Sequence, residues 1–381
     1  MTVGGRRLTC VVGTRPQLIK AAAAWPDLRA RHRPVLIDTG QHYDDGMAGA
    51  FFGELGLPAP AHQLGVGSGT HARQVAAMLD RLEPILIGQT PDAVVVFGDT
   101  NSTLAGALVA AKLGLPLAHV EAGLRSFDRG MPEEVNRVVV DHLSGLLLAP
   151  NVEAAGNLAA ERIGAGRSSA RVLVVGDLMQ DLCAATVPAV RDEAAIRGGA
   201  SEEVRALGLR TGQYVFATVH RAENREPAAI HAWTRILGEL GQPVVLALHP
   251  GTRQALDEHG SVLPRRVHVV PPQGYRATLA LELHAAAVVT DSGGVQREAA
   301  WLGTPCLVLR ETTEWGGTLE AAGGRAALVG RDLDRALAAM ARLAPPKRAL
   351  AGAVARSATA TVPPAGAGAA IAAAIEDWLG S

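Results

Sequence analysis

Cysteine and aromatic residues are scarce in this chain of 381 residues, which has three cysteines, 3% aromatics and a net charge of −1. The cysteines, Cys10, Cys183 and Cys306, lie far apart in apolar segments. This spacing predicts buried, reduced thiols and offers neither a disulfide framework nor a zinc site. A net charge near zero predicts no binding to nucleic acid or to anionic membranes through bulk electrostatics.

Long apolar runs are also missing from the sequence. No segment approaches the ~20 apolar residues that a membrane-spanning helix needs, and the first ten residues lack the apolar segment of a signal peptide. With 48% hydrophobic and 19% charged residues, the composition is that of a soluble globular protein, which we expect in the cytoplasm. The length exceeds that of one ordinary hydrophobic core, so two domains are expected.

Short apolar strands alternate with helical stretches, which is the pattern of repeated βαβ units and parallel sheets. Strands are expected near residues 8–12, 34–38, 93–97, 116–120, 145–149, 171–175, 214–219, 243–248, 267–270, 286–290, 305–309 and 326–329. The stretch Val187 to Glu203 has no strand pattern and predicts a linker. The predicted fold class is α/β, with Rossmann-like domains over 1–186 and 187–358 and a C-terminal helix within 359–381 that packs back on the first domain.

Three strands are followed by a glycine turn, a polar residue and a helix start: at GTRPQLIK, FGDTNSTLAGAL and TDSGGVQRE. In the last of these, Ser292 is a good N-cap, and Gly293 and Gly294 let a phosphate approach the positive end of the helix dipole. Glu298 could accept two hydrogen bonds from a ribose diol. Taken alone, this segment favours an ordinary capped helix over a phosphate site. Because ligands gather at the carboxyl ends of parallel strands, the three turns favour two sheets facing a cleft.

Seven motifs, in this order, resemble the non-hydrolysing UDP-N-acetylglucosamine 2-epimerases: GTRPQLIK, TGQHYDDGM, GSGTHARQ, FGDTNSTLAGAL, HVEAGLRSFDRGMPEEVNR, ATVHRAEN and TDSGGVQREA. The resemblance runs from about Leu8 to Gly330, and seven ordered motifs are highly specific. It implies the GT-B-like fold of nucleotide-sugar glycosyltransferases, a UDP-sugar in the cleft, a homodimer, and inversion at C2 without NAD or metal. It also implies a place in polysaccharide or amino-sugar biosynthesis.

The resemblance also implies roles for individual residues. The implied catalytic residues are Lys20, Asp99, Glu121, Glu133 and His220, and the implied substrate-binding residues are Arg15, Arg125, Arg137, Arg221, Ser292, Gly293, Gly294, Glu298 and Arg310. Lysine is rare here, since only three of the 36 basic residues are lysines, so its presence in a matched motif favours a functional role. The resemblance does not assign the base and acid roles individually among Asp99, Glu121 and Glu133.

The chemistry of the implied reaction explains why such residues are needed. The C2–H of the sugar lies beside an acetal carbon and is too weak an acid for direct removal, so departure of UDP from C1 must acidify it. Anti elimination then yields UDP and 2-acetamidoglucal, and re-addition of UDP gives the C2 epimer. Carboxylates must therefore transfer protons, and cations or N–H donors must stabilise the departing diphosphate.

Each of these residues also has a structural interpretation. Asp99 could be the N-cap of the helix that follows its strand, Glu133 could be a first-turn acid that complements a helix dipole, and His220 could be a satisfied histidine at a strand end. The order of the seven motifs favours the catalytic interpretation.

The chain departs from the family pattern at several positions. Asp44 and Asp45 follow Gln41 and His42 where a second glutamine typically helps to hold an activating UDP-N-acetylglucosamine. Because carboxylates repel a diphosphate, we expect that second site to be weak or absent. The segment TTEWGGTLE and Arg297 also depart from the pattern, which keeps a related UDP-2-acetamido sugar open as the substrate. A hydrolysing epimerase, a GT-B glycosyltransferase and a non-catalytic UDP-sugar sensor remain alternatives.

Overall fold

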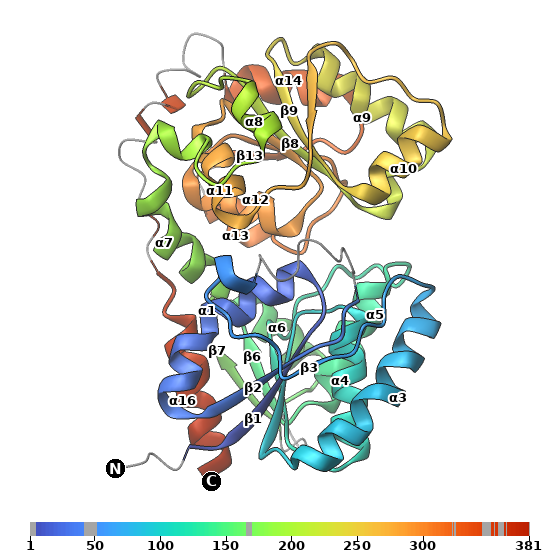
Figure 1. Ribbon diagram of the computed structural model, residues 1–381, viewed down its shortest axis with the longest axis vertical. Helices are drawn as coiled ribbons and strands as arrows, with labels where there is room; N and C mark the ends of the chain where they lie inside the picture. Colours follow the sequence, from blue (N-terminus) through green and yellow to red (C-terminus); the bar gives the residue numbers. More distant parts are fainter. Residues whose placement is uncertain are drawn as a thin grey trace. The chain divides into compact units, whose positions relative to one another are not determined.

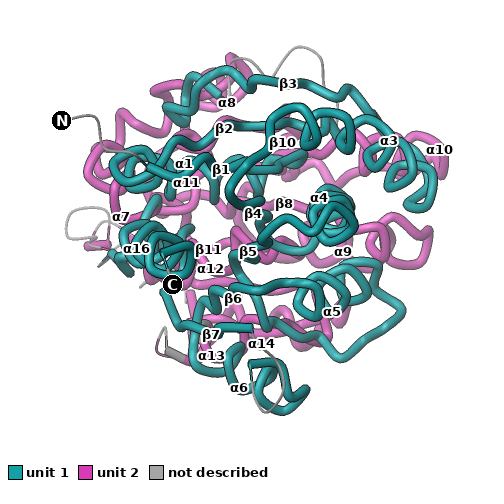
Figure 2. Tube along the Cα trace, turned by 90° about the horizontal axis from the view of Figure 1, so that it is seen from below, with its two compact units in different colours: residues 1–182, 364–381 teal, residues 183–363 magenta. Residues whose placement is uncertain are grey.

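The protein folds into two compact α/β units (Figure 1). The computed structural model describes residues 5–41, 52–164, 170–321, 323, 325–344, 352–353, 355–356, 362 and 364–380. The first unit contains Met1–Leu182 together with Pro364–Ser381, and the second contains Cys183–Pro363 (Figure 2). The predicted α/β class with two Rossmann-like domains is confirmed.

The first unit has a seven-stranded parallel sheet with the order β3-β2-β1-β4-β5-β6-β7. Its strands are β1 (Arg7–Val12), β2 (Arg33–Asp38), β3 (His62–Gln63), β4 (Ala93–Phe97), β5 (Leu117–Val120), β6 (Leu146–Ala149) and β7 (Arg171–Val174), and its helices are α1 (Arg15–Arg31), α3 (His71–Gln89), α4 (Asn101–Lys112), α5 (Pro132–Leu143) and α6 (Val152–Ala160). Strands β4 and β6 are buried throughout, as parallel strands covered on both faces should be. The strand order reverses between β1 and β4, which creates a topological switch point.

The second unit has a six-stranded parallel sheet with the order β10-β9-β8-β11-β12-β13. Its strands are β8 (Val215–Val219), β9 (Val244–Leu248), β10 (Val267–Val270), β11 (Ala287–Thr290), β12 (Cys306–Val308) and β13 (Ala326–Leu328). Its helical segments are η1 (Glu193–Ile196), α8 (Glu202–Ala206), η2 (Ala222–Asn224), α9 (Pro227–Glu239), α10 (Pro250–Glu258), α11 (Tyr275–His284), α12 (Gly293–Leu302), α13 (Gly316–Ala321) and α14 (Leu333–Leu343). The switch point here lies between β8 and β11. Every strand expected from the sequence is confirmed, and the short β3 is an addition.

The chain leaves the first unit within α7 (Leu178–Val190), between residues 182 and 183, and returns between residues 363 and 364. The sequence placed this boundary at 186/187 and a linker over 187–203. In the structure that stretch lies in the second unit, where Ile196 and Ala200 are buried against Tyr214. Its apolar residues are the physical reason, because they contribute to a core that an exposed linker could not join.

The alanine-rich C-terminal segment forms α16 (Ala367–Gly380), which belongs to the first unit and lies against α1 (Figure 2). Ile371 and Ile375 are fully buried. His32 and Arg31, at the end of α1, contact this helix through a 3.0 Å hydrogen bond to the Ala372 carbonyl and an ion pair with Glu376. Apolar burial and these polar contacts hold the end of the chain to the first unit.

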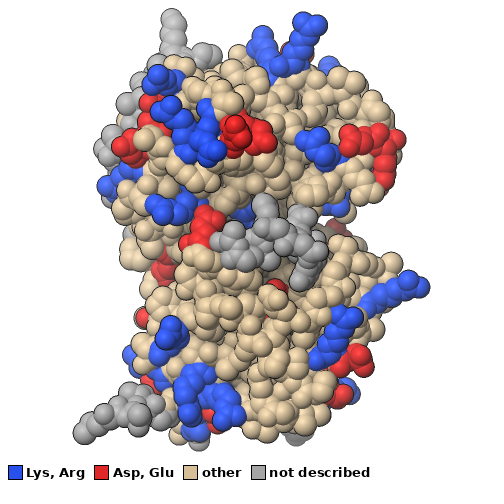
Figure 3. All heavy atoms as spheres, viewed as in Figure 1, with Lys and Arg blue, Asp and Glu red and all other residues tan. Residues whose placement is uncertain are grey.

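The surface and the cysteines agree with the composition. Acidic and basic side chains are interspersed on the face shown in Figure 3. Cys10, Cys183 and Cys306 are buried free thiols, which confirms the prediction that they are buried. Across the described residues, no helix combines the length and apolar character needed to cross a membrane.

Candidate functional site

Tight turns end the strands at the switch point of the first unit. At Gly13, after β1, a Cβ atom would lie 1.9 Å from Thr39 Oγ1 and 2.2 Å from Ser102 Oγ, so only glycine lets the turn approach α4 this closely. At Gly98, after β4, φ is +64°. Glu121, after β5, has a φ of +70°, and such strained backbone at a non-glycine residue is concentrated at functional sites.

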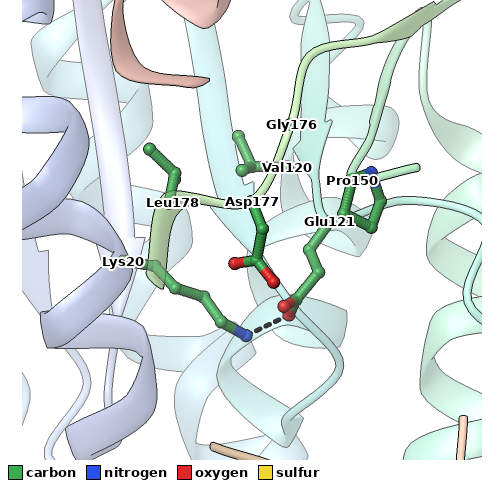
Figure 4. A pocket seen from close by; sticks show the side chains of 7 residues that line it. All are labelled: Lys20, Val120, Glu121, Pro150, Gly176, Asp177 and Leu178. Carbon is green, nitrogen blue, oxygen red and sulfur yellow. Dashed lines mark hydrogen bonds and ion pairs between the residues drawn. The ribbon is translucent and has the colours of Figure 1, made fainter. Parts of the chain in front are cut away.

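Lys20 of α1 and Glu121 form a buried ion pair in this region, and each side chain is 9% exposed. Both residues line a pocket (Figure 4) together with Val120, Pro150, Gly176, Asp177 and Leu178. The pocket therefore contains an ammonium group and two carboxylates. It brings together two of the predicted catalytic residues, one from the first helix and one from the end of β5.

Asp177 is a pocket residue that the sequence analysis missed. It follows β7 and Gly176, and its Oδ1 accepts a 2.9 Å hydrogen bond from the Met179 backbone N–H at the start of α7. The segment VLVVGDLMQ has the same order of strand, glycine, polar residue and helix as the three turns that were recognised. That order was the available signal.

Asp99 lies at the end of β4 and is held by Arg137 of α5. Arg137 Nη2 donates to Asp99 Oδ2 at 2.5 Å, and its Nη1 donates to Glu134 Oε2 at 3.0 Å. The N-cap of α4 is Thr100, so Asp99 does not have the capping role that its position also allowed. Two predicted site residues, Asp99 and Arg137, are thus brought into direct contact.

Glu133 and Glu134 both lie in the first turn of α5, which is the dipole position expected for Glu133. Glu134 is buried, and its carboxylate accepts hydrogen bonds from the backbone N–H groups of Ser126 and Phe127. Glu133 is half-buried, and its carboxylate has no hydrogen bond or ion pair among the described residues. Of the two neighbouring acids, Glu134 shapes the loop before α5, and Glu133 is the one that protein contacts leave available to a ligand.

A buried network supports these turns. His119 of β5 is bonded to Asp141 through Nδ1 at 2.7 Å and to the Gly98 carbonyl through Nε2 at 2.7 Å. Arg125 donates from Nη1 to Asp141 and from Nε and Nη2 to Glu161, each at 2.7 Å. Burial alone would raise the pKa of Asp141, but His119 and Arg125 lower it overall. The guanidinium of Arg125, predicted as a substrate contact, is therefore engaged by protein acceptors.

At the switch point of the second unit, His220 follows β8 and Asp291 follows β11. His220 Nδ1 lies 2.9 Å from Asp291 Oδ1, and the same carboxylate accepts from the Arg221 backbone N–H and Asn224 Nδ2, each at 2.9 Å. Burial would raise the pKa of Asp291, but His220 and these hydrogen bonds hold it well below its usual range. A fully buried carboxylate thus orients a histidine ring that is 42% exposed.

Helix α12 begins where the sequence predicted. Ser292 is its N-cap and accepts a hydrogen bond from the Val295 N–H at 3.4 Å, and Gly293 and Gly294 form the first turn. A Cβ atom on Gly293 would lie 3.2 Å from Trp315 Nε1, so the segment before α13 approaches this helix end closely. The predicted N-cap is confirmed, and the first N–H groups of α12 form a potential anion site.

Arginines surround this helix end. Arg310 Nη2 donates to Glu314 at 2.7 Å, and Arg221 Nη2 lies 3.7 Å from the same carboxylate. Burial would raise the pKa of Glu314, but these two guanidinium groups lower it to about 2. Arg297 stacks 3.5 Å from the centre of the Trp315 ring, a cation–π contact. The segment that departs from the family pattern is therefore packed against the predicted phosphate site.

The two remaining predicted binding residues, Arg15 and Glu298, lie on the helices that follow β1 and β11, the strands beside the two switch points. Arg15 is the first residue of α1, directly after the turn at Gly13. Glu298 lies on α12, is 3% exposed, and lies near Tyr275 and Glu282 of α11. The predicted site residues thus fall into two groups: Arg15, Lys20, Asp99, Glu121, Glu133 and Arg137 near the first switch point, and His220, Arg221, Ser292, Gly293, Gly294, Glu298 and Arg310 near the second.

Comparison with known proteins shows similarity over most of the chain. The family model described as UDP-N-acetylglucosamine 2-epimerase matches residues 27–372. The UDP-N-acetylglucosamine 2-epimerase of Methanocaldococcus jannaschii is 38% identical, with 88% of this chain and 91% of the relative covered. The UDP-2,3-diacetamido-2,3-dideoxy-D-glucuronate 2-epimerase of Pseudomonas aeruginosa is 41% identical, with 81% of this chain and 84% of the relative covered.

A solved structure agrees with these sequence matches. The M. jannaschii UDP-GlcNAc 2-epimerase, in complex with UDP-GlcNAc and UDP, has a TM-score of 0.84 and 36% identity, covering 97% of this chain and 99% of its own. The motifs, the two parallel sheets and the similarity along nearly the full length all lead to the same conclusion. The chain belongs to the UDP-N-acetylglucosamine 2-epimerase family.

Proposed function

We propose that this protein interconverts UDP-N-acetylglucosamine and UDP-N-acetylmannosamine by eliminating UDP and adding it back. The observation that carries the proposal is the buried Lys20–Glu121 pair, which lies in a pocket at the end of β5, next to the strand β4 that Asp99 follows. Carboxylates at a sheet edge suit proton transfer at a sugar carbon. The activities named for the similar proteins support the same reaction.

In the elimination step a carboxylate takes the C2 proton, the C–H electron pair forms the C1=C2 bond, and the C1–O pair leaves with UDP. Glu121, Asp99 and Glu133 are the proposed proton-transfer groups. Lys20 forms an ion pair with Glu121, and Arg137 forms one with Asp99, so each carboxylate is held in place by a cation. In the second step the intermediate is protonated on its other face and UDP adds back to C1.

The second unit is proposed to hold UDP. The first N–H groups of α12, with Arg221 and Arg310, would bind the diphosphate, and Glu298 would accept hydrogen bonds from the ribose. His220, oriented by Asp291, would balance the charge of the departing diphosphate. Arg15 is proposed as a further phosphate contact. For Arg125 the structure supports a positioning role instead, because its donors bind Asp141 and Glu161.

A second candidate substrate is a UDP-2,3-diacetamido sugar acid. The Pseudomonas relative, whose printed name specifies that substrate, is as similar to this chain as the N-acetylglucosamine enzymes are. Arg297 and Trp315, which depart from the family pattern, lie near the proposed phosphate site. The resemblance further supports a cytoplasmic homodimer in polysaccharide or amino-sugar biosynthesis, and analytical ultracentrifugation would test the oligomeric state.

The first test follows solvent hydrogen into the product. Purified protein is incubated in heavy water with each UDP-sugar in turn, and the product is examined by NMR. The expected product carries deuterium at C2 with UDP still attached, because elimination exchanges that proton. A product with its original C2–H would contradict the mechanism. Free sugar as the main product would support a hydrolysing epimerase, and turnover of the diacetamido sugar alone would select the second substrate.

A further inference from the structure

An acidic side chain behind the proposed UDP site has no role so far. Glu282 lies on α11 and is fully buried. Tyr275, seven residues earlier, is on the same face of that helix because seven residues make about two turns. Helix α11 packs against α12, which carries Glu298. A glutamate and a tyrosine of one helix therefore approach the carboxylate proposed to bind ribose.

These buried groups pose a hydrogen-bonding problem. Neither side-chain oxygen of Glu282 accepts a hydrogen bond from the described residues, and the Tyr275 hydroxyl has no hydrogen-bond partner among them either. An ionised Glu282 could only accept, whereas a protonated one could donate to a neighbouring carboxylate. Within the described part of the chain, the titratable groups around Glu282 are Glu298, Tyr275, Tyr214 and Cys306, and none of these is a cation. An ionised Glu282 would be an uncompensated buried charge, which is very costly.

We propose that Glu282 keeps its proton in the folded protein and donates a hydrogen bond to the Glu298 carboxylate, as a positioning residue for the UDP site. This donor from α11 fixes the orientation in which Glu298 accepts the ribose hydroxyls. The ribose part of this inference rests on the proposed function, whereas the shared proton does not.

The electrostatics support a retained proton. Burial raises the pKa of Glu282 well above its usual range, and the neighbouring charge and hydrogen bond of Glu298 raise it further. Burial and Glu298 also raise the pKa of Tyr275, so its hydroxyl stays a donor. At alkaline pH Glu282 would lose its proton, and two adjacent carboxylates would repel each other.

Binding of UDP to the full chain tests the positioning role. Calorimetry from about pH 6 to about pH 9 compares the wild type with Glu282→Gln and Glu282→Leu. For the wild type, Kd should rise on the alkaline side. Glu282→Gln keeps a neutral donor and should give a flat profile, whereas Glu282→Leu should raise Kd about 10-fold at neutral pH. Identical profiles for wild type and Glu282→Gln, or an unchanged Kd for Glu282→Leu, would overturn the proposal.

Urea unfolding tests the proton without any ligand. Because the folded pKa is raised, the wild type should lose stability as pH rises above about 4.3, the unfolded value, towards the folded pKa. Glu282→Gln lacks this dependence, so its urea midpoint should exceed that of the wild type by an amount that grows with pH. For the exposed control Glu239→Gln, the difference from the wild type should not grow with pH. If the difference in urea midpoint between Glu282→Gln and the wild type stayed constant with pH, Glu282 would be ionised in the folded protein, and the proposal would be overturned. If the wild type fails to bind UDP, the proposed function is wrong, but urea unfolding still shows whether Glu282 keeps its proton.

Discussion

The two units share one strand order but present different chemistry at the same place in it. In both, the strand order reverses beside the first strand of the sheet, and the notable side chains follow the strands at that switch point or next to it. The first unit places Glu121 and Asp99 there, each paired with a cation. The second places His220 there, with the capped N-terminus of α12. Topology therefore determines where a site can form, and the turn residues determine its chemistry.

The acids of the two units also differ in how they are bonded. In the first unit, Glu121 is paired with Lys20 and Asp99 with Arg137, and Glu121 lines a pocket. In the second unit, Asp291 is enclosed by N–H donors and a histidine, and Glu314 is flanked by two arginines. This difference suggests that acids of the first unit react, whereas acids of the second unit position other groups. Substitutions in the two units should therefore change different kinetic constants.

The largest expected effect is that of Glu121→Gln in the first unit. The amide cannot accept a proton from carbon, so kcat should fall by about 10²- to 10⁴-fold. UDP affinity should change little, because UDP is proposed to contact the second unit. Steady-state kinetics and calorimetry measure the two quantities separately. The control is Glu153→Gln, at an exposed position of α6 in the same unit, which should leave kcat unchanged. If the Kd for UDP in Glu121→Gln rose in step with the loss of kcat, the proposed division of roles between the two units would be wrong.

Glu298→Ala in the second unit should show the opposite pattern. The carboxylate is proposed to contact ribose equally in the ground state and the transition state, so UDP affinity should fall while kcat at saturation changes much less. Loss of charge-assisted hydrogen bonds should cost roughly 1.5 to 3 kcal/mol of binding. Calorimetry with UDP provides the measurement. An unchanged dissociation constant would remove Glu298 from the site.

Most of the fold could be predicted because its determinants are local. A buried parallel strand such as β4 is a continuous β-branched run, and Ser292 with two glycines marks a helix start whatever lies elsewhere in the chain. The unit boundary was harder to place. It falls within α7, which has no break in its sequence pattern, and residues 187–203 lack strand periodicity although part of them is buried.

Partners that are distant in the chain were the features that sequence reasoning missed. Asp291 has no site role in the sequence analysis, because its partner His220 lies 71 residues earlier. The contact between Glu282 and Glu298 joins two helices, and nothing local distinguishes Glu282 from a surface acid. Asp177 was different, since it follows the recognised order of strand, glycine and helix and could have been found.

The smallest expected effect concerns activation of the enzyme by a second UDP-sugar molecule. This expectation starts from the hydrogen bonds of Gln41. The side-chain oxygen of Gln41 accepts hydrogen bonds from Ser102, at 3.0 Å from its N–H and 2.7 Å from its hydroxyl. Gln41 is thus used to hold the first turn of α4. The next residues of that motif, His42, Asp44 and Asp45 among them, lie outside the described residues, so their predicted effect on a second UDP-sugar rests on charge alone.

We predict that the reverse reaction, from UDP-N-acetylmannosamine, starts without added UDP-N-acetylglucosamine, and that forward rates rise hyperbolically with substrate. Two carboxylates at Asp44 and Asp45 would repel a second diphosphate, and Gln41 already has protein partners. Reverse progress curves with and without trace UDP-N-acetylglucosamine provide the measurement. A long lag that the trace abolishes would demonstrate an activator site. In that case Asp44→Asn with Asp45→Asn should shorten the lag only if the two acids border that site, because removing their charge would then strengthen activator binding.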